Sequence, residues 1–188
     1  MVLYINACVR DESRTDKLAS ELLVKIGEYK EVNLEKEFLQ GKLQPLTKDS
    51  LKRRDSLIEA GNYGDPIFDY AKQFASADTI VIAAPFWDFG IPALLRIYLE
   101  VIYAIGIVSK YNEQGMPVGL CKADKLYFVT TSGGPYIPDF SYNYVAGLAI
   151  QAFGISKIEL IKAELLDIVG NNPDEIIDNE IAKLKNLF

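Results

Sequence analysis

Hydrophobic residues along this chain gather into short runs that are separated by longer amphipathic stretches. Five of the runs have the composition of buried strands, and they predict β-strands over residues 2–6, 29–34, 78–85, 125–132 and 157–165. The stretches between them predict helices over about 13–26, 66–75, 91–105, 141–153 and 173–188. Strands and helices that alternate in this way predict one open parallel sheet with helices on both faces.

The segment 35–65 interrupts this alternation. It is rich in Lys, Gln, Asp and Gly, and a helix is expected only around 47–60. Because the segment is too long for a simple connection between two elements, we expect it to be an insertion close to a functional site.

Length, composition and charge limit the number of domains and the kinds of partner that this chain is expected to have. The 188 residues, 49% of them hydrophobic, suffice for a single domain over 1–188 with a substantial core. The net charge of −6, without any run of Lys and Arg, argues against nucleic acid or an anionic membrane as a partner. The most apolar stretch, 91–108, contains Arg96 and Glu100, so it does not predict a membrane span, and the N-terminus lacks the pattern of a signal peptide.

Cysteine and histidine usage excludes several kinds of catalysis. Cys8 and Cys121 form neither a disulfide framework nor a zinc-binding spacing, which is typical of reduced thiols in a cytoplasmic protein. The chain has no histidine. We therefore expect no Ser-His-Asp or Cys-His nucleophile and no metal site.

In an open parallel sheet, ligands bind in the crevice beyond the carboxyl ends of the strands. The loops that follow the first, third and fourth predicted strands cover residues 6–15, 85–90 and 131–136. These three loops are therefore the candidates for a binding site.

The first loop leads into a helix N-terminus, where free N–H groups and the helix dipole favour an anion. Ser13 and Thr15 add hydroxyl donors, and Arg10 and Arg14 add positive charge. The same residue types occur in ordinary helix caps, and Ser13 followed by Asp16 resembles a capping box. A plain cap with solvated arginines is thus the alternative.

The second loop combines aromatic residues with an acidic one. Pro85 ends the strand, and Phe86, Trp87 and Phe89 could form flat walls for a planar ligand. Their alternative role is to fill the core. Asp88 is expected to contact water or a backbone N–H group, and not to be catalytic.

The third loop contains the adjacent glycines Gly133 and Gly134, followed by Pro135 and Tyr136. Glycines let the backbone approach a ligand closely, although a plain turn would use the same residues. Together the three loops offer a seat for a phosphate, an aromatic wall and a second set of backbone donors. Flavin mononucleotide (FMN) has a phosphate at one end and a planar, hydrogen-bonding ring at the other.

At this point the sequence resembles a known family, the flavodoxin-like, FMN-dependent NAD(P)H:quinone oxidoreductases and azoreductases. "ADTIVIAAPFWDFGIPALLRIYLE" and "SKYNEQGMPVGLCKADKLYFVTTSGGPY" are similar to its third and fourth strands with their flavin loops, and "INACVRDESRT" to its phosphate loop. The resemblance implies a flavodoxin-like three-layer α/β sandwich, a parallel sheet in the order 2-1-3-4-5, and a homodimer with FMN at its interface. It implies that FMN contacts Cys8, Arg10, Ser13, Arg14, Thr15, Pro85, Phe86, Trp87, Asp88, Phe89, Thr131, Ser132, Gly133, Gly134 and Tyr136.

The resemblance also implies an enzyme that passes a hydride in two steps, from NADH or NADPH to FMN and then to a quinone, azo compound or nitroaromatic. Tyr136 is the candidate catalytic residue, because many family members have a histidine or tyrosine there, and a packing role is its alternative. Ser132 stands where some azoreductases have an arginine. Two other functions stay open, an FMN-binding electron carrier that serves a protein partner and an FMN-free binding module with the same fold.

The predicted helix 91–105 has more apolar surface than its own sheet should cover. Its charged residues are Arg96 and Glu100, which lie four positions apart on one narrow face. A second copy of the chain is expected to cover the surplus. The expected contact residues are Leu95, Leu99 or Ile102.

Overall fold

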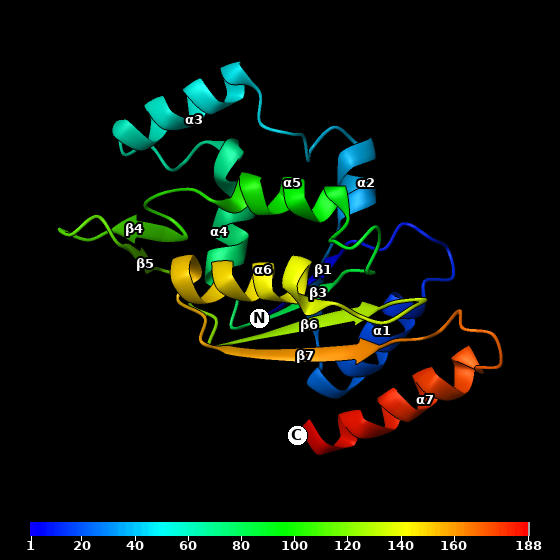
Figure 1. The fold of residues 1–188 in the computed structure, drawn as a ribbon. Helices are drawn as coiled ribbons and strands as arrows, with labels where there is room; N and C mark the ends of the chain where they lie inside the picture. The colour runs from blue at the N-terminus through cyan, green and yellow to red at the C-terminus, as the bar shows by residue number, and fades with distance from the viewer. Residues whose placement is uncertain (188) are drawn as a thin grey trace.

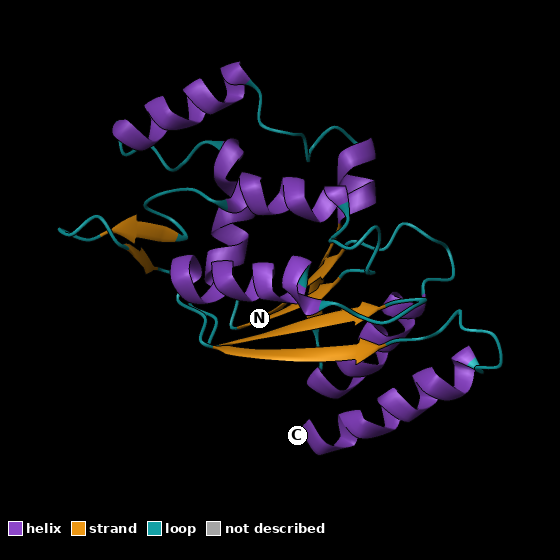
Figure 2. Cartoon of the chain, viewed as in Figure 1, coloured by secondary structure: helices purple, strands orange, loops and turns teal. Residues whose placement is uncertain are grey.

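The computed structural model describes residues 1–187, and a parallel sheet forms its centre (Figures 1 and 2). Within these residues the sheet has five strands, in the order β2-β1-β3-β6-β7. Counted along the sheet's own strands, this is the predicted order 2-1-3-4-5. The strands are β1 (Val2–Asn6), β2 (Tyr29–Asn33), β3 (Thr79–Ala83), β6 (Lys125–Thr131) and β7 (Lys157–Ala163).

Helices cover both faces of the sheet and complete three layers, as Figure 1 shows. One face carries α1 (Arg14–Ile26) and α7 (Pro173–Lys183). The opposite face carries α2 (Leu34–Leu39), α4 (Asp69–Ser76), α5 (Ala93–Ile102) and α6 (Tyr142–Leu148). A 3₁₀ turn (Pro66–Phe68) precedes α4, a π-helical turn (Ala149–Phe153) extends α6, and a 3₁₀ turn (Leu184–Leu187) follows α7.

The two-sided sheet explains the continuous apolar strands of the sequence. Ile80 and Ile82 of β3 belong to the core under α4, α5 and α6, whereas Val81 and Ala83 belong to the core under α1 and α7. Successive side chains of a strand point to opposite faces, so a strand covered on both sides favours apolar residues at both alternating sets of positions.

Two features differ from the sequence prediction. An antiparallel hairpin of β4 (Ser109–Tyr111) and β5 (Pro117–Gly119) projects beside the main sheet and was not predicted. The segment 35–65 forms part of α2, then a loop and the expected helix α3 (Lys48–Glu59), which lies outside α5 in Figure 1. Among residues 1–187, no helix is long and apolar enough to cross a bilayer.

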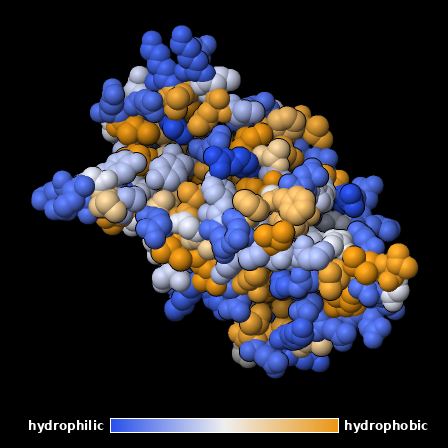
Figure 3. Space-filling model, in the orientation of Figure 1, coloured by the Kyte–Doolittle hydropathy of each residue, from blue (hydrophilic) through white to orange (hydrophobic). Residues whose placement is uncertain are grey.

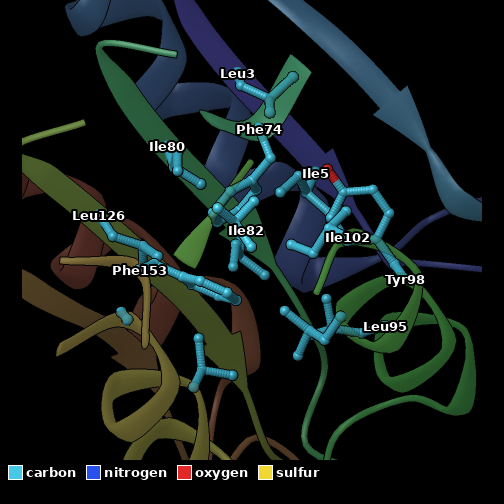
Figure 4. Close-up of a cluster of buried hydrophobic side chains, with 14 of the residues drawn as sticks. Leu3, Ile5, Phe74, Ile80, Ile82, Leu95, Tyr98, Ile102, Leu126 and Phe153 are labelled. Carbon is cyan, nitrogen blue, oxygen red and sulfur yellow. The ribbon is translucent and has the colours of Figure 1, made fainter. Parts of the chain in front are cut away.

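The expected subunit contacts on α5 are wrong. Leu95, Leu99 and Ile102 are 0%, 2% and 0% exposed within the single chain. Figure 4 shows Leu95 and Ile102 among the side chains that α5 packs against the sheet. Positions 95, 99 and 102 form one stripe of a helix, and that stripe is the one consumed by the chain's own core.

Candidate functional site

A cleft lies at the carboxyl edge of the sheet, where the loops after β1, β3, β6 and β7 meet. Its larger part, here called the polar chamber, has a volume of about 610 Å³. The polar chamber is lined by Arg10, Glu12, Ser13, Arg14, Pro85, Phe86, Trp87, Asp88, Thr131, Ser132, Gly133, Leu166 and Asp167.

A second part, here called the apolar recess, continues the cleft over a volume of about 490 Å³. It is lined by Phe86, Asp88, Phe89, Ser132, Gly133, Gly134, Pro135 and Ile137, four of which also line the polar chamber. The cleft therefore joins a polar end to an apolar end. Among the described residues that line it, none comes from 35–65, so the expected insertion close to the site is wrong.

The first loop ends at the N-terminus of α1, beside the polar chamber. Ser13 is the N-cap residue, and its side-chain oxygen accepts a hydrogen bond from the N–H of Asp16 at 3.3 Å. The expected capping box is only half formed, because the Asp16 carboxylate accepts hydrogen bonds from the Tyr4 hydroxyl and, at 3.1 Å, from the Asn6 amide. Asn6 in turn accepts the N–H of Cys8 at 2.9 Å, which fixes the path of the loop.

The two arginines of the first loop both line the polar chamber, but each has a partner. The Arg10 guanidinium lies 5.4 Å from the centre of the Trp87 ring. Arg14 donates to a carboxylate oxygen of Asp167 at 2.7 Å. An anion in the chamber would therefore meet Arg14 together with the negative charge of Asp167.

The second loop is a tight turn that is tied to the sheet. The N–H of Phe86 donates to the carbonyl of Thr131 at 3.0 Å, and Trp87 and Gly90 exchange two backbone hydrogen bonds. Asp88 and Phe89, at the two central positions, have φ values of 48° and 61°. Left-handed residues at both positions define a type I′ turn.

The third loop is held by the loop that follows β7. Three N–H groups of that loop donate to carbonyls of the third loop, Leu165 to Gly134 at 3.1 Å, Leu166 to Ser132 at 3.2 Å, and Asp167 to Gly133 at 2.9 Å.

These contacts use the carbonyl groups of the third loop and leave two of its backbone donors without a backbone partner. The N–H groups of Gly133 and Gly134 take part in none of the backbone hydrogen bonds found among residues 1–187. A Cβ atom on Gly133 would lie 2.2 Å from a carboxylate oxygen of Asp167, so a larger residue at this position would displace the Asp167 side chain.

Most residues expected to contact FMN line the cleft, but the side chains of Cys8 and Thr15 do not. Cys8 is buried, its sulfur lies 3.9 Å from the carbonyl oxygen of Ala83, and burial raises the pKa of its thiol to about 12. The buried hydroxyl of Thr15 shares a hydrogen bond of 2.6 Å with that of Thr131 and thereby ties α1 to β6. Both side chains therefore stabilise the loops of the site from the protein interior, without lining the cleft.

Tyr136, the candidate catalytic residue, also packs behind the cleft. Its hydroxyl shares a hydrogen bond of 2.7 Å with that of Ser141, and burial raises its pKa. Its N–H donates to the carboxylate of Glu164 at 2.8 Å. Its ring lies 5.0 Å from the ring of Phe86, centre to centre. This arrangement favours the packing role that the sequence left as an alternative.

The loop after β7 also borders the cleft and was not predicted from the sequence. Leu166 and Asp167 line the polar chamber although neither was a candidate. The predicted strand order could have indicated this loop. In the order 2-1-3-4-5 the fifth strand lies beside the fourth, and the loops after both strands leave the same edge of the sheet.

A further depression, here called the apolar groove, lies on the other side of the 87–90 turn. It has a volume of about 810 Å³, and Trp87 and Asp88 line both it and the polar chamber. Its other lining residues come from the first loop, the end of the 87–90 turn, the segment before and within α5, and the segment before and within α6: Val9, Gly90, Ile91, Pro92, Ala93, Leu94, Arg96, Asp139, Phe140 and Tyr144.

Sheet order, layers and cleft define a doubly wound α/β protein of the flavodoxin type. Among solved structures the chain is similar to an azoreductase from Bacillus anthracis str. Sterne, with a TM-score of 0.84, 24% identity and coverage of 99% of this chain and 97% of that one. It is also similar to an FMN-dependent NADH-azoreductase from Bacillus anthracis str. Ames Ancestor in complex with FMN, with a TM-score of 0.79, 22% identity and coverage of 99% and 96%. At these identities the likeness concerns the fold.

Comparison of sequences also shows the family to which the chain belongs. The model of the flavodoxin-like fold family matches residues 1–188. The chain is 37% identical to an FMN-dependent NADH:quinone oxidoreductase of Clostridium beijerinckii, over 98% of this chain and 96% of that protein. It is 36% identical to FMN-dependent NADH:quinone oxidoreductase 2 of Clostridium acetobutylicum, over the same shares. The chain therefore belongs to the flavodoxin-like fold family and, within it, to the FMN-dependent NADH:quinone oxidoreductases.

Proposed function

We propose that this chain is an FMN-dependent oxidoreductase that takes electrons from NADH and passes them to a small-molecule quinone or azo compound. The observation that carries the proposal is the shape of the cleft, in which a polar chamber at a helix N-terminus opens into an apolar recess. FMN has the same polarity, with a phosphate at one end and a planar ring at the other. Relatives that match the chain over nearly its whole length have this activity in their names.

The donors in the cleft fit FMN at both ends. The first turn of α1 has N–H groups without partners inside the helix, and Ser13 and Arg14 stand beside them. The N–H groups of Gly133 and Gly134 can donate to the polar edge of a ring, and Phe86 can pack against its face.

Bound FMN would supply the redox chemistry, accepting a hydride from NADH and delivering electrons to the second substrate. The residues of the chain would bind the cofactor and orient it. Backbone N–H groups that are fixed before binding stabilise negative charge on a nearby oxygen without having to reorganise. Gly133 and Gly134 meet this condition because their loop is hydrogen-bonded to the loop after β7. The aromatic side chains of the apolar recess exclude water from the same space.

The chain is proposed to act as one domain and as a homodimer. The apolar groove supports the dimer, because it is large, shares Trp87 and Asp88 with the cleft and is lined by Phe140, whose side chain is largely exposed. On the face shown in Figure 3, hydrophobic residues form several patches among hydrophilic ones. A cytoplasmic location is proposed because both cysteines are free thiols.

Steady-state kinetics test the proposed function. FMN-loaded protein should oxidise NADH when 1,4-naphthoquinone is supplied, and the same protein without FMN should not. Oxidation of NADH that requires an added redox-protein partner would instead indicate an electron carrier. A protein that takes up no FMN would be a binding module, and the proposal would be wrong.

A further inference from the structure

The turn at residues 87–90 keeps two side chains in a backbone conformation that they disfavour. Asp88 and Phe89 both have positive φ values, and among residues 1–187 Leu165 is the other non-glycine residue with this feature. Asp and Asn adopt the left-handed conformation at moderate cost, whereas a bulky aromatic residue there is an outlier. The type I′ turn would form with less strain if glycine replaced Phe89, since Asp-Gly is among its preferred sequences.

The strain at Phe89 is not offset by burial of its ring. The side chain is 65% exposed. It meets the Phe86 ring nearly edge to face, with the ring centres 6.2 Å apart, and Phe86 meets Tyr136 in a similar way. The three rings form a row that begins in the protein at Tyr136 and ends at Phe89 in solvent.

The outer end of this row lies at the apolar recess. Phe89 lines the recess together with Pro135 and Ile137 of the third loop. A planar molecule that enters the recess would therefore meet the Phe89 ring at the solvent side, as the first aromatic surface on its way in. A strained and exposed residue that borders a ligand cleft is the kind of feature that functional sites retain.

We infer that Phe89 is a specificity-determining residue, whose ring selects planar aromatic electron acceptors such as naphthoquinones over smaller ones. The inference rests on the proposed function and names the substrate class of the same site. Phe86 and the paired glycines lie deeper and serve the cofactor, whereas the ring of Phe89 serves the second substrate. The strain of the turn is what keeps this ring in solvent and next to the recess.

The test compares Phe89→Gly with Phe89→Tyr in FMN-loaded protein, and the main readout is binding of 2-naphthol, a planar aromatic that is not an electron acceptor. Phe89→Gly should weaken binding of 2-naphthol about tenfold and lower the kcat/KM ratio of 1,4-naphthoquinone to 1,4-benzoquinone, because the stacking surface is lost. It should also raise Tm by about 2–4 °C, because strain is relieved. Phe89→Tyr, which keeps the ring, should retain 2-naphthol binding.

Leu165→Gly is the matched control for strain, because it relieves a left-handed residue whose side chain does not line the cleft. It should raise Tm without loss of 2-naphthol binding. Unchanged 2-naphthol affinity in Phe89→Gly would overturn the inference. A tenfold loss of FMN affinity in Phe89→Gly would also overturn the inference, because Phe89 would then be part of the cofactor wall. Dissociation of a wild-type dimer by Phe89→Gly would overturn it as well, because the side chain would then serve the subunit contact. A wild-type protein that binds no FMN would overturn the proposed function itself.

Discussion

Arg14 shows how one residue can be shared between the fold and a ligand. Its ion pair with Asp167 is largely exposed, and such pairs contribute little to stability. Both Arg14 and Asp167 line the polar chamber. Their main effect is therefore on the electrostatic environment of a phosphate bound there. The negative charge of Asp167 opposes the anion that Arg14 would attract.

Replacing Asp167 by Asn should therefore tighten FMN binding. Removal of one charge beside the phosphate should stabilise the complex by about 1 kcal/mol, or roughly fivefold in Kd. Riboflavin, which lacks the phosphate, should bind as before. Asp178→Asn, which removes a carboxylate paired with Lys17 on the outside of α1, is the control, and titration by flavin fluorescence measures all three proteins. Weaker FMN binding by Asp167→Asn would show that Asp167 accepts a hydrogen bond from the cofactor.

Glu164 gives a prediction on pH. The ion pair with Lys162, followed by the N–H of Tyr136, holds the pKa of this carboxyl below its ordinary value. A lowered pKa in the folded state stabilises the fold above the unfolded value of about 4.3, and that contribution is lost as the pH falls through the folded value. Glu164→Gln should therefore lower Tm at neutral pH, and its difference from wild type should shrink in acid.

Thermal unfolding followed by circular dichroism, from about pH 7 down to about pH 3, measures this difference. Glu159→Gln, on the strand β7 that precedes Glu164, controls for the loss of a carboxylate. A difference between wild type and Glu164→Gln that stays constant over the whole range would mean that the Glu164 carboxylate is not stabilised in the folded protein.

At the scale of elements, the sequence showed which loops meet but not which side chains face inward. The loops after β1, β3 and β6 were found because a parallel sheet brings the ends of its strands to one edge. Cys8 and Thr15 were expected at the ligand, but both side chains are buried, that of Cys8 in the first loop and that of Thr15 in the first turn of α1. Periodicity does not reveal this, because a loop has no regular face.

The same limit applied to α5. The apolar surface of α5 was expected to be larger than the sheet could cover. In the structure, the sheet, α2 and α4 together bury a broad part of that surface. Leu95→Ala should destabilise the fold by about 2–5 kcal/mol, because it opens a cavity in the core under this helix. Urea unfolding measures the loss, and the association state of the remaining folded protein should not change. A loss below about 1 kcal/mol would mean that the core relaxes around the site.

At the scale of the whole molecule, the sheet and its helices followed from the sequence because long apolar strands alternate with helices. The β4–β5 hairpin was missed, since its strands have three residues each and carry no clear alternation. The positions of α2 and α3 against α5 depend on tertiary contacts, such as the bond of 3.3 Å from Arg54 to the carbonyl of Glu100, which no local pattern contains.

The homodimer is best tested at the apolar groove. Ala93 is exposed, lies at the start of α5 and lines the groove. An arginine at this position should leave the monomer folded but block a partner, so Ala93→Arg should be monomeric by light scattering at concentrations where wild type is dimeric. Ala182→Arg, at an exposed alanine of α7, should leave the dimer intact. Equal dimeric masses for wild type and Ala93→Arg would place the interface elsewhere, and a monomeric wild type would contradict the proposed homodimer.

FMN is proposed to bind in the cleft with its phosphate at the N-terminus of α1 and its ring at the third loop. The most direct measurement compares the Kd of FMN with that of riboflavin for the wild-type protein. Two charge-assisted hydrogen bonds to the phosphate, at about 1.5–3 kcal/mol each, predict that FMN binds about 100-fold more tightly or better. Equal affinities for the two flavins would rule out this binding mode, because the polar chamber would then contribute nothing to recognition of the phosphate.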